Sequence, residues 1–342
     1  MSGRKGRTGA DEDVAAAEAG PGAGAAGATR SDSLRIRAAW MYFIEQKTQS
    51  EISEILGIGR VSVIRLLAEA RVRQEVKITI ESELAETTAL ERALEARFGL
   101  RRALIAPLAS AEADPTPVIG AATGGYVSEL LAPGMSVGVG WGRTLFSSLP
   151  HIRARPLQDL RVISLLGGVG VARHFNPAEF AWRFASLFQG EGYLIPAPAL
   201  VDSVATKQAL VERCGLNKVL ALADRLDMVL LSVGSILSAT TFYRGGYLSD
   251  REQKELGDQG AVGDVLFHFF DRDGVLLDHP INDRVMSVDV DRLRRAGRRV
   301  LASGGQDKTG ALLGAMALLE PTDFITDEQT ARRLLAASRR AA

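Results

Sequence analysis

Short apolar runs, most of them followed by glycine, constrain the fold of this chain more than any other feature. They occupy residues 103–106, 135–139, 161–166, 228–233 and 299–302. Such near-continuous runs are typical of strands buried on both faces of a parallel sheet. Segments with helical periodicity lie between them, for instance residues 173–190 and 308–319. This alternation predicts a doubly wound α/β domain, which we expect to span residues 104–342.

Residues 49–70 have a different pattern, in which two amphipathic segments flank a turn that contains Gly57. Apolar side chains repeat at helical spacing in both segments: Ile52, Ile55 and Leu56 in the first, and Val63, Ile64, Leu66 and Leu67 in the second. Glycine at position 57 can adopt the positive φ that ends a helix. The arrangement predicts a helix-turn-helix, whose second helix would lie in the major groove of DNA.

Polar residues of the second helix suit that role. Arg60, Ser62 and Arg65 lie off the apolar stripe, near the N-terminal half of the helix. Arginine can contact guanine or phosphate, and serine can bond to either. We therefore expect these three residues, together with Gln49 at the start of the first helix, to contact DNA. The alternative interpretation is an ordinary helical hairpin with a solvated basic face.

The segments around this motif complete the expected DNA-binding domain, residues 31–80. A helix over residues 33–46 is predicted, with Ser31 or Ser33 as its N-cap. Its expected buried stripe comprises Ile36, Ala39, Trp40, Phe43 and Ile44. Residues 76–80 alternate in polarity and predict a strand, which we interpret as a wing.

Two further segments flank this domain. Sixteen of the first thirty residues are Ala or Gly, so residues 1–30 are expected to form a disordered tail. Residues 81–103 are expected to form a linker, with a helix over 84–98 that Gly99 ends. In this helix Leu90, Leu94 and Phe98 recur at four-residue spacing. It would either pair with its copy in a dimer or cover the next sheet, and the pattern slightly favours the second.

Composition excludes several classes of protein. The net charge of the 342 residues is zero, so any surface that binds nucleic acid must be local. A single cysteine, Cys214, allows no internal disulfide, as expected for a cytoplasmic protein. The four histidines are scattered and do not have the spacing of zinc ligands, so we expect no metal or cofactor. No apolar run is long enough to cross a membrane.

The predicted sheet also suggests where a ligand binds. In doubly wound folds the ligand crevice lies at the carboxyl ends of the strands, where the glycine clusters fall here. Gly142 and Thr144 follow one strand, and Lys308 follows another at the start of a helix. Backbone N–H groups, a hydroxyl and an ammonium are suited to binding a phosphate. The alternative is that these glycines only form the tight turns that any α/β protein needs.

The chain resembles the SorC family of sugar-responsive transcriptional regulators. In the N-terminal part the resemblance rests on residues 38–43, 48–52, 56–60 and 65–71. In the remainder it rests on residues 138–144, 243–247, 260–264, 270–274 and 304–309. Two positions depart from the family: Gly59 stands where serine is frequent, and Gln74 stands near a frequent glycine. Residues 40–43 are similar to those of members that govern polyol catabolism.

The resemblance implies an effector domain that is similar to sugar-phosphate isomerases and binds phosphorylated sugars or polyols. It assigns Gly142, Arg143 and Thr144 to a phosphate loop, Arg244 and Lys308 to a cationic clamp, and Asp264 to an acceptor for sugar hydroxyls. Each assignment has a simpler alternative. Arg143 would form a surface ion pair, Arg244 would stabilise its own loop, and Asp264 would be an ordinary turn residue.

These observations predict a transcriptional regulator that binds operator DNA as a homodimer or homotetramer and responds to a phosphorylated sugar or polyol. One alternative is an isomerase-like enzyme fused to a helical hairpin, with Asp202, Asp227 or Asp264 as the general base. The spacing of these residues marks none of them as a base, so we predict no catalytic residue. A purely structural DNA-bending protein is another alternative, but it would not need phosphate loops.

Overall fold

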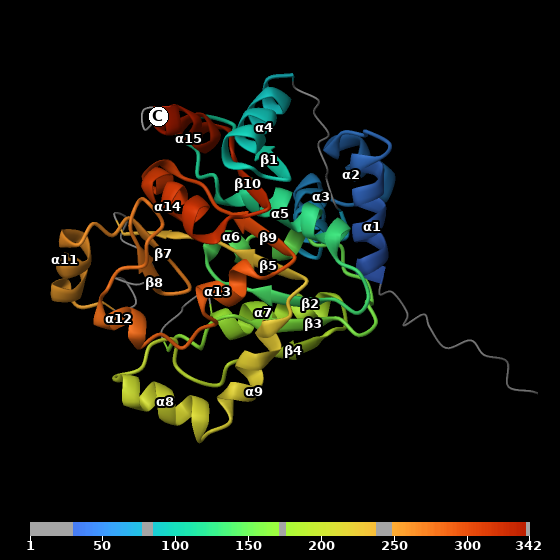
Figure 1. Ribbon diagram of the computed structural model, residues 1–342. Coiled ribbons are helices and arrows are strands. Elements are labelled where there is room, and N and C mark those ends of the chain that lie inside the picture. Colours follow the sequence, from blue (N-terminus) through green and yellow to red (C-terminus); the bar gives the residue numbers. More distant parts are fainter. Residues whose placement is uncertain (1–29, 77–84, 171–175, 237–247, 340–342) are drawn as a thin grey trace, which may run out of the picture. The chain divides into compact units, whose positions relative to one another are not determined.

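The computed structural model describes residues 30–76, 85–170, 176–236 and 248–339 (Figure 1). Backbone contacts divide the chain into two compact units, Met1–Thr79 and Ile80–Ala342. Residues 1–29 of the predicted tail, the wing strand beyond Val76 and the effector residue Arg244 lie outside the described residues. We refer to the two units as the N-terminal unit and the C-terminal unit.

The N-terminal unit contains helices α1 (Arg30–Phe43), α2 (Gln49–Leu56) and α3 (Arg60–Val72). Gly57 has a φ of 64° and ends α2, which confirms its predicted role. Thr48 caps the start of α2 in a reciprocal box with Glu51, a signal that the sequence analysis missed. Gly59 precedes α3 without a side-chain hydrogen bond, as expected where serine is replaced by glycine.

The face of α1 that packs inward agrees with the predicted stripe only at Ala39 and Phe43. Ala38 and Ala39 are buried against Ile52, Val63 and Leu67, whereas Ile36, Trp40 and Ile44 are exposed. Two members of the predicted apolar stripes, Ile55 of α2 and Ile64 of α3, are exposed as well. Ser31 and Ser33 lie inside α1 rather than at its cap. Small alanines therefore bring α1 close to α3, and three of the large apolar side chains of α1 face outward.

A buried arginine joins α1 to the end of α3. Arg35 is almost fully buried and forms two 2.6 Å hydrogen bonds to the carboxylate of Glu75. Its guanidinium also donates to Asp32 at 2.7 Å. The bidentate pair fixes the position at which the chain leaves α3.

We expect acid to destabilise the N-terminal unit through this pair. The hydrogen bond from Arg35 lowers the pKa of Glu75 below its ordinary value of 4.5. A carboxylate whose pKa is lower in the folded state stabilises the fold above its unfolded pKa, and this contribution is lost as pH falls. Hydrogen exchange of α1 and α3 amides should therefore accelerate below about pH 4.5 in the wild type but change less in Glu75→Gln. An equal acid response in both proteins would contradict this role.

The C-terminal unit is built on a seven-stranded sheet with the order β1-β10-β9-β5-β2-β3-β4, in which every pairing is parallel (Figure 1). The strands are β1 (Arg102–Ala106), β2 (Ser136–Val139), β3 (Arg161–Ser164), β4 (Glu191–Tyr193), β5 (Met228–Leu231), β9 (Arg298–Ala302) and β10 (Asp323–Asp327). The five predicted strands are present. Strands β4 and β10 were not predicted, because their residues do not form continuous apolar runs.

Helices cover both faces of this sheet, which confirms the predicted doubly wound fold. Met228 and Leu230 of β5 pack with α5 (Thr116–Leu130) and α7 (Pro177–Leu187). Val229 and Leu231 point to the opposite face, which is covered by α4 (Ala85–Phe98), α13 (Val290–Arg294), α14 (Thr309–Leu319) and α15 (Glu328–Arg339). The remaining helices are α6 (Arg143–Phe146), α8 (Val204–Glu212), α9 (Leu216–Ala221), α11 (Asp250–Asp258) and α12 (Pro280–Asp283). Three single-turn 3₁₀ helices are η1 (Leu149–His151), η2 (Leu222–Asp224) and η3 (Gln306–Lys308).

A small antiparallel sheet, which was not predicted, continues from the end of β5. It consists of β6 (Gly234–Ser235), β7 (Gly263–Val265) and β8 (His268–Phe270). Gly234 pairs with Asp264, and the Ser235 hydroxyl donates to the carbonyl of Asp307 at 2.9 Å. The small sheet therefore places Asp264 beside the carboxyl ends of the parallel strands.

Helix α4, the predicted linker helix, covers the edge of the large sheet. Leu94 is fully buried in the same core as the sheet, and Leu90 and Phe98 pack around it. Glu91 and Glu95 accept hydrogen bonds from the backbone N–H groups of Ile105 and Ala103, at 3.0 Å and 3.1 Å. The structure thus agrees with the second of the two interpretations of this helix.

Candidate functional site

Three loops meet at the carboxyl edge of the sheet, after β2, β5 and β9. The N–H of Gly140 donates to the carbonyl of Leu230 at 2.8 Å, so the loop after β2 is held against β5. Gly142 and Gly305 precede α6 and η3 with φ values of 119° and 126°, a region that favours glycine. The turns therefore require these glycines, and both loops bring a helix start to the same edge.

Lys308 connects two of these loops. Its Nζ donates to the carbonyl of Val233 at 3.0 Å and to Oγ of Ser303 at 3.3 Å. The stem of the residue is partly exposed, but burial of the ammonium lowers its pKa. The charges of Asp307, Arg143, Asp264 and Asp114 also act on this pKa. An ammonium with two neutral acceptors retains the capacity to bind an anion.

Asp264 lies in β7 and is 4% exposed. Its Oδ2 accepts a hydrogen bond from the backbone N–H of Phe267 at 3.3 Å. Burial raises the pKa of this carboxyl to about 7, against the opposing effects of that hydrogen bond and of Lys308. Gly234 lies close by, and a Cβ atom at that position would be 2.2 Å from Oδ1 of Asp264.

The turn after Asp264 is strained. Leu266 and Phe267 both have positive φ, 49° and 70°, although both are bulky and buried. Such backbone is unfavourable for large residues and persists only where the surroundings impose it. The centroid of the Phe267 ring lies 5.4 Å from that of Trp141. Trp141 stands between Gly140 and Gly142 in the sequence. The strained turn therefore packs the loop after β2 against the segment that holds Asp264.

The remaining residues of the predicted phosphate loop have distinct environments. Thr144 is 5% exposed, and its carbonyl accepts a hydrogen bond from the hydroxyl of Ser147 at 2.7 Å. Arg143 is exposed and forms an ion pair with Asp114 at 3.5 Å, which is the simpler alternative considered for this residue. Asp114 was not singled out from the sequence, because it lies in the loop between β1 and α5 and follows no apolar run.

A buried carboxylate holds the loop after β9 in place. Asp327, at the end of β10, accepts 2.9 Å and 2.6 Å hydrogen bonds from the backbone and hydroxyl of Thr330. The Thr330 hydroxyl in turn accepts from the backbone N–H of Gly305 at 2.9 Å. A Cβ atom on Gly304 would lie 2.3 Å from Asp327. The position of Lys308 thus depends on contacts with the first turn of α15.

The other two carboxylates considered as general bases lie outside this cluster. Asp227 precedes β5, at the amino edge of the sheet, and accepts a hydrogen bond from the N–H of Ser136 at 2.7 Å. Asp202 is exposed and lies before α8, where hydrogen bonds from Thr206 and neighbouring groups lower its pKa. Of the three candidates, only Asp264 lies beside Lys308.

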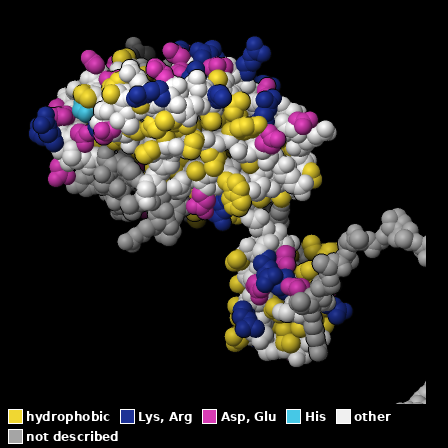
Figure 2. Space-filling model, turned by 90° about the horizontal axis from the view of Figure 1, so that it is seen from below, with side chains coloured by type: hydrophobic (Ala, Val, Ile, Leu, Met, Phe, Trp, Pro, Cys, Tyr) yellow, Lys and Arg dark blue, Asp and Glu magenta, His cyan; other side chains and the backbone are white. Residues whose placement is uncertain are grey.

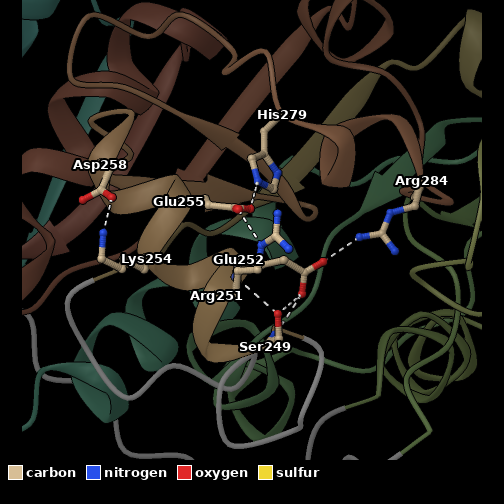
Figure 3. Close-up of polar contacts among 8 residues, drawn as sticks. All are labelled: Ser249, Arg251, Glu252, Lys254, Glu255, Asp258, His279 and Arg284. Carbon is tan, nitrogen blue, oxygen red and sulfur yellow. Dashed lines mark hydrogen bonds and ion pairs between the residues drawn. The ribbon is translucent and has the colours of Figure 1, made fainter.

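Figure 3 shows a second group of charged residues, on α11, and its contacts identify it as an anchor of the helix. Glu252 forms a capping box with Ser249 and accepts a 2.7 Å hydrogen bond from Arg284. Glu255 pairs with Arg251 at 2.7 Å and approaches the buried His279 at 3.5 Å. These charges satisfy one another and fix the helix in place, so we do not include them in the site.

The predicted DNA-contacting residues lie on α2 and α3 of the N-terminal unit. Arg60 and Arg65 are exposed, whereas Gln49 and Ser62 are partly exposed. Val61 and Ile64 are exposed between the two arginines, a feature that the predicted apolar stripe obscured. Two further basic residues make contacts within the unit: the Arg71 guanidinium lies 5.2 Å from the ring of Phe43, and Arg73 pairs with Glu69 at 2.7 Å.

The described residues contain no group of three or more His, Cys, Asp or Glu side chains placed to hold a metal ion. The helices among these residues lack the combination of length and hydrophobicity needed to span a bilayer.

Comparison with known proteins places the whole arrangement in one family. Residues 82–336 match the Sugar-bind family model, which describes a sugar-binding domain. The chain is 29% identical to the erythritol catabolism regulatory protein EryD of Brucella abortus, over 90% of this chain and 98% of that protein. It is 30% identical to the transcriptional regulator LsrR of Enterobacter sp., over 90% of this chain and 94% of that protein.

A solved structure supports the same assignment. The full-length sorbitol operon regulator SorC of Klebsiella pneumoniae is 26% identical, with a TM-score of 0.71, and the match covers 89% of this chain and 98% of that one. The shared fold thus extends over both units. The chain belongs to the SorC family of transcriptional regulators with a sugar-binding domain.

Proposed function

We propose that this protein is a DNA-binding regulator of a carbohydrate or polyol catabolic operon, controlled by a phosphorylated sugar or polyol. The observation that carries the proposal is that Lys308, whose Nζ bonds to the carbonyl of Val233, and the buried Asp264, which pairs with the next residue Gly234, meet at the carboxyl edge of the sheet on a chain that also has a helix-turn-helix. Relatives are named for erythritol catabolism, for sorbitol and for deoxyribonucleosides, which supports this class of effector.

The chemistry of the crevice suits such a ligand. Lys308 would neutralise a phosphate, and the backbone at Gly142 and the hydroxyl of Thr144 would donate to its oxygens. Asp264 would accept hydrogen bonds from sugar hydroxyls, which requires its ionised form. By family resemblance Arg143 and Arg244 would add positive charge. If Arg143 bound the phosphate instead of Asp114, the carboxylate of Asp114 would be released to solvent.

DNA recognition would require two copies of the chain. A helix-turn-helix usually reads a two-fold operator as a dimer, so we propose a homodimer or homotetramer in the cytoplasm. The effector would shift the population between two arrangements of these copies. Within each copy, Arg60 and Arg65 would contact guanine or phosphate, Ser62 and Gln49 would add hydrogen bonds, and Val61 and Ile64 would contact thymine methyl groups.

Lys308→Ala tests the effector site. A charge-assisted hydrogen bond is worth about 1.5–3 kcal/mol, so we expect the variant to bind a phosphorylated sugar or polyol roughly ten- to a hundredfold more weakly. A thermal-shift screen of such compounds would identify the ligand, since a ligand at 100 times its Kd stabilises the fold by about 2.7 kcal/mol. Operator binding without ligand should persist. Lys254→Ala, which removes an exposed lysine that pairs with Asp258, is the matched control.

Reciprocal titrations separate binding from regulation. Operator DNA should change the affinity for the effector by the same factor by which the effector changes the affinity for DNA. Equal ligand binding by the wild type and Lys308→Ala would show that the phosphate clamp lies elsewhere. Binding that is independent of DNA would leave the crevice intact and refute the regulatory mechanism.

Arg60→Ala and Arg65→Ala test the DNA-binding surface. Loss of a base contact should weaken the free energy of operator binding by about 1–3 kcal/mol and relax specificity. Loss of a phosphate contact should instead lower, by about one, the slope of log affinity against log salt concentration. Operator affinity measured by fluorescence anisotropy at several salt concentrations distinguishes these results. Arg183→Ala removes an exposed arginine from α7 of the C-terminal unit and serves as the control. Unchanged affinity and salt dependence in both variants would exclude α3 as the reading helix.

One observation favours a second candidate, an isomerase-like enzyme. A carboxyl with a pKa of about 7 is suited to proton abstraction, and Asp264 lies near Lys308 at the carboxyl edge of the sheet. Turnover assays with aldose and ketose phosphates distinguish this candidate from the regulator. Loss of turnover in Asp264→Asn would support it, and binding without turnover in the wild type would exclude it.

A further inference from the structure

The outward face of α1 carries a stripe of three large apolar side chains. Ile36, Trp40 and Ile44 are 51%, 58% and 62% exposed. The N–H of Ile44 donates to the carbonyl of Trp40 at 2.9 Å, so the last turn of the helix extends to Ile44. Residues four apart lie on one side of a helix, and the three span about 12 Å along its axis. Figure 2 shows hydrophobic side chains at the surface of the N-terminal unit, beside charged ones.

This face is not required for the fold of the N-terminal unit. The opposite side of α1 supplies the contacts with α2 and α3, through Ala38, Ala39 and the buried Arg35. Single exposed apolar residues are common on proteins, but three aligned large ones, including a tryptophan, are typical of an interaction site. The stripe therefore indicates a partner.

The order of the residues identifies the partner as a second copy of the chain. The stripe reads Ile-Trp-Ile in either direction, so a two-fold axis through Trp40 stacks tryptophan on tryptophan and Ile36 on the partner's Ile44. A two-fold interface requires such self-complementarity, because the same patch serves both copies. The same axis brings Arg37 of one copy toward Glu45 of the other, and these are charges of opposite sign.

We propose that Ile36, Trp40 and Ile44 form the contact between two antiparallel α1 helices, which joins two N-terminal units in the DNA-binding dimer. Three side chains bury far less than the approximately 800 Å² per partner of a standard stable interface. The contact is therefore weak alone, and it closes when operator DNA or contacts elsewhere hold two copies together, which raises their effective concentration. This inference rests on the proposed DNA-binding function for its purpose, though not for its geometry.

Disulfide capture in the full-length chain tests the contact without DNA. In a Cys214→Ser background, Trp40→Cys places one thiol at the two-fold axis, where its distance to the partner's thiol is shortest. Val61→Cys places a thiol on α3, at a residue that is 80% exposed, and reports random collision. Under mild oxidation we expect Trp40→Cys to form a covalent dimer at least tenfold faster than Val61→Cys. Adding Ile36→Asp to the Trp40→Cys chain should reduce the rate to that of Val61→Cys.

Each outcome decides the question separately from the proposed function. Equal rates for Trp40→Cys and Val61→Cys would refute the α1 contact, and would mean that other parts of the same chain or a different partner cover the stripe. Rapid capture that Ile36→Asp does not slow would also refute it, because the approach would then not involve the stripe. Operator binding by wild-type protein would still test the regulator independently. Because Trp40 is exposed, circular dichroism of Trp40→Cys should show an intact fold.

Discussion

Asp264→Asn is expected to stabilise the chain above pH 7 while weakening effector binding. Burial raises the pKa of Asp264 to about 7 from an ordinary value of 3.8. A group whose pKa is raised on folding stabilises the fold most at low pH, and this contribution is lost between about pH 4 and pH 7. Ionisation of the Asp264 carboxyl therefore lowers the free energy of unfolding by at most about 4 kcal/mol. Asparagine has a similar shape, keeps an acceptor for Phe267 and carries no charge.

Denaturant unfolding between pH 4 and pH 8 measures this effect. The stability difference between Asp264→Asn and the wild type should grow as pH rises to about 7 and then level off. Asp258→Asn, which alters an exposed aspartate on α11, should show no such rise. A variant that is less stable than the wild type at pH 8 would show that the folded chain favours the ionised form of Asp264.

Adjacent glycines in α5 should respond to alanine with opposite signs. A Cβ atom on Gly124 would lie 2.5 Å from the carbonyl oxygen of Ser148 and 2.7 Å from Cβ of His151, so Gly124→Ala forces α5 away from η1. Overpacking of this kind costs about 1–3 kcal/mol. Gly125 has no atom within 4 Å of the corresponding position, so Gly125→Ala should stabilise the helix by about 0.5–1 kcal/mol.

Denaturant unfolding of the two variants and the wild type at one pH measures both effects. The segment that α5 contacts includes α6 and follows directly from Gly142, so Gly124→Ala should also weaken effector binding, whereas Gly125→Ala should not. Destabilisation by both substitutions would indicate that α5 tolerates no added bulk on either side. A neutral Gly124→Ala would indicate that η1 moves without cost.

The parallel strands were predictable because burial on both faces requires continuous apolar runs. Strand β10 lacks such a run, since its sequence is Asp-Phe-Ile-Thr-Asp, and the first of its two buried aspartates is satisfied by groups far away in the chain. Asp323, for instance, accepts a hydrogen bond from the hydroxyl of Tyr126 at 2.5 Å. Local patterns carry no record of such partners, so this strand was missed.

The buried side chains of α1 were predicted only in part, for a different reason. Periodicity favoured Ile36, Trp40 and Ile44 together with Ala39 and Phe43, whereas the structure buries Ala38 and Ala39 and leaves the first three exposed. Close packing against α3, where Ala70 is also buried, selected the small residues. Size complementarity between two helices depends on both of them, so the hydrophobicity of one helix cannot determine it.

The candidate site was predictable in part. Gly142, Thr144 and Lys308 follow apolar runs directly, so their place at the carboxyl edge was expected from the fold class alone. The role of Asp114 depends on its ion pair with Arg143, that of Ser303 on the hydrogen bond from its hydroxyl to the carbonyl of Val233, and that of Asp327 on the bond between Thr330 and Gly305. All three contacts join segments that are distant in sequence. The strained turn at Leu266 and Phe267 was also hidden, because neither residue type indicates positive φ.

Glu91 and Glu95 of α4 protect the edge strand β1 from pairing with a strand of another molecule. Strand β1 lies at the edge of the sheet, where N–H groups are open to any passing strand. Glu91 and Glu95 are one helical turn apart, about 6 Å, which nearly matches the roughly 6.6 Å between alternate residues of a strand. Each carboxylate thus occupies one N–H group of β1. Removing both glutamates would expose a template for strand addition, and amyloid-like aggregation would then compete with ordered assembly.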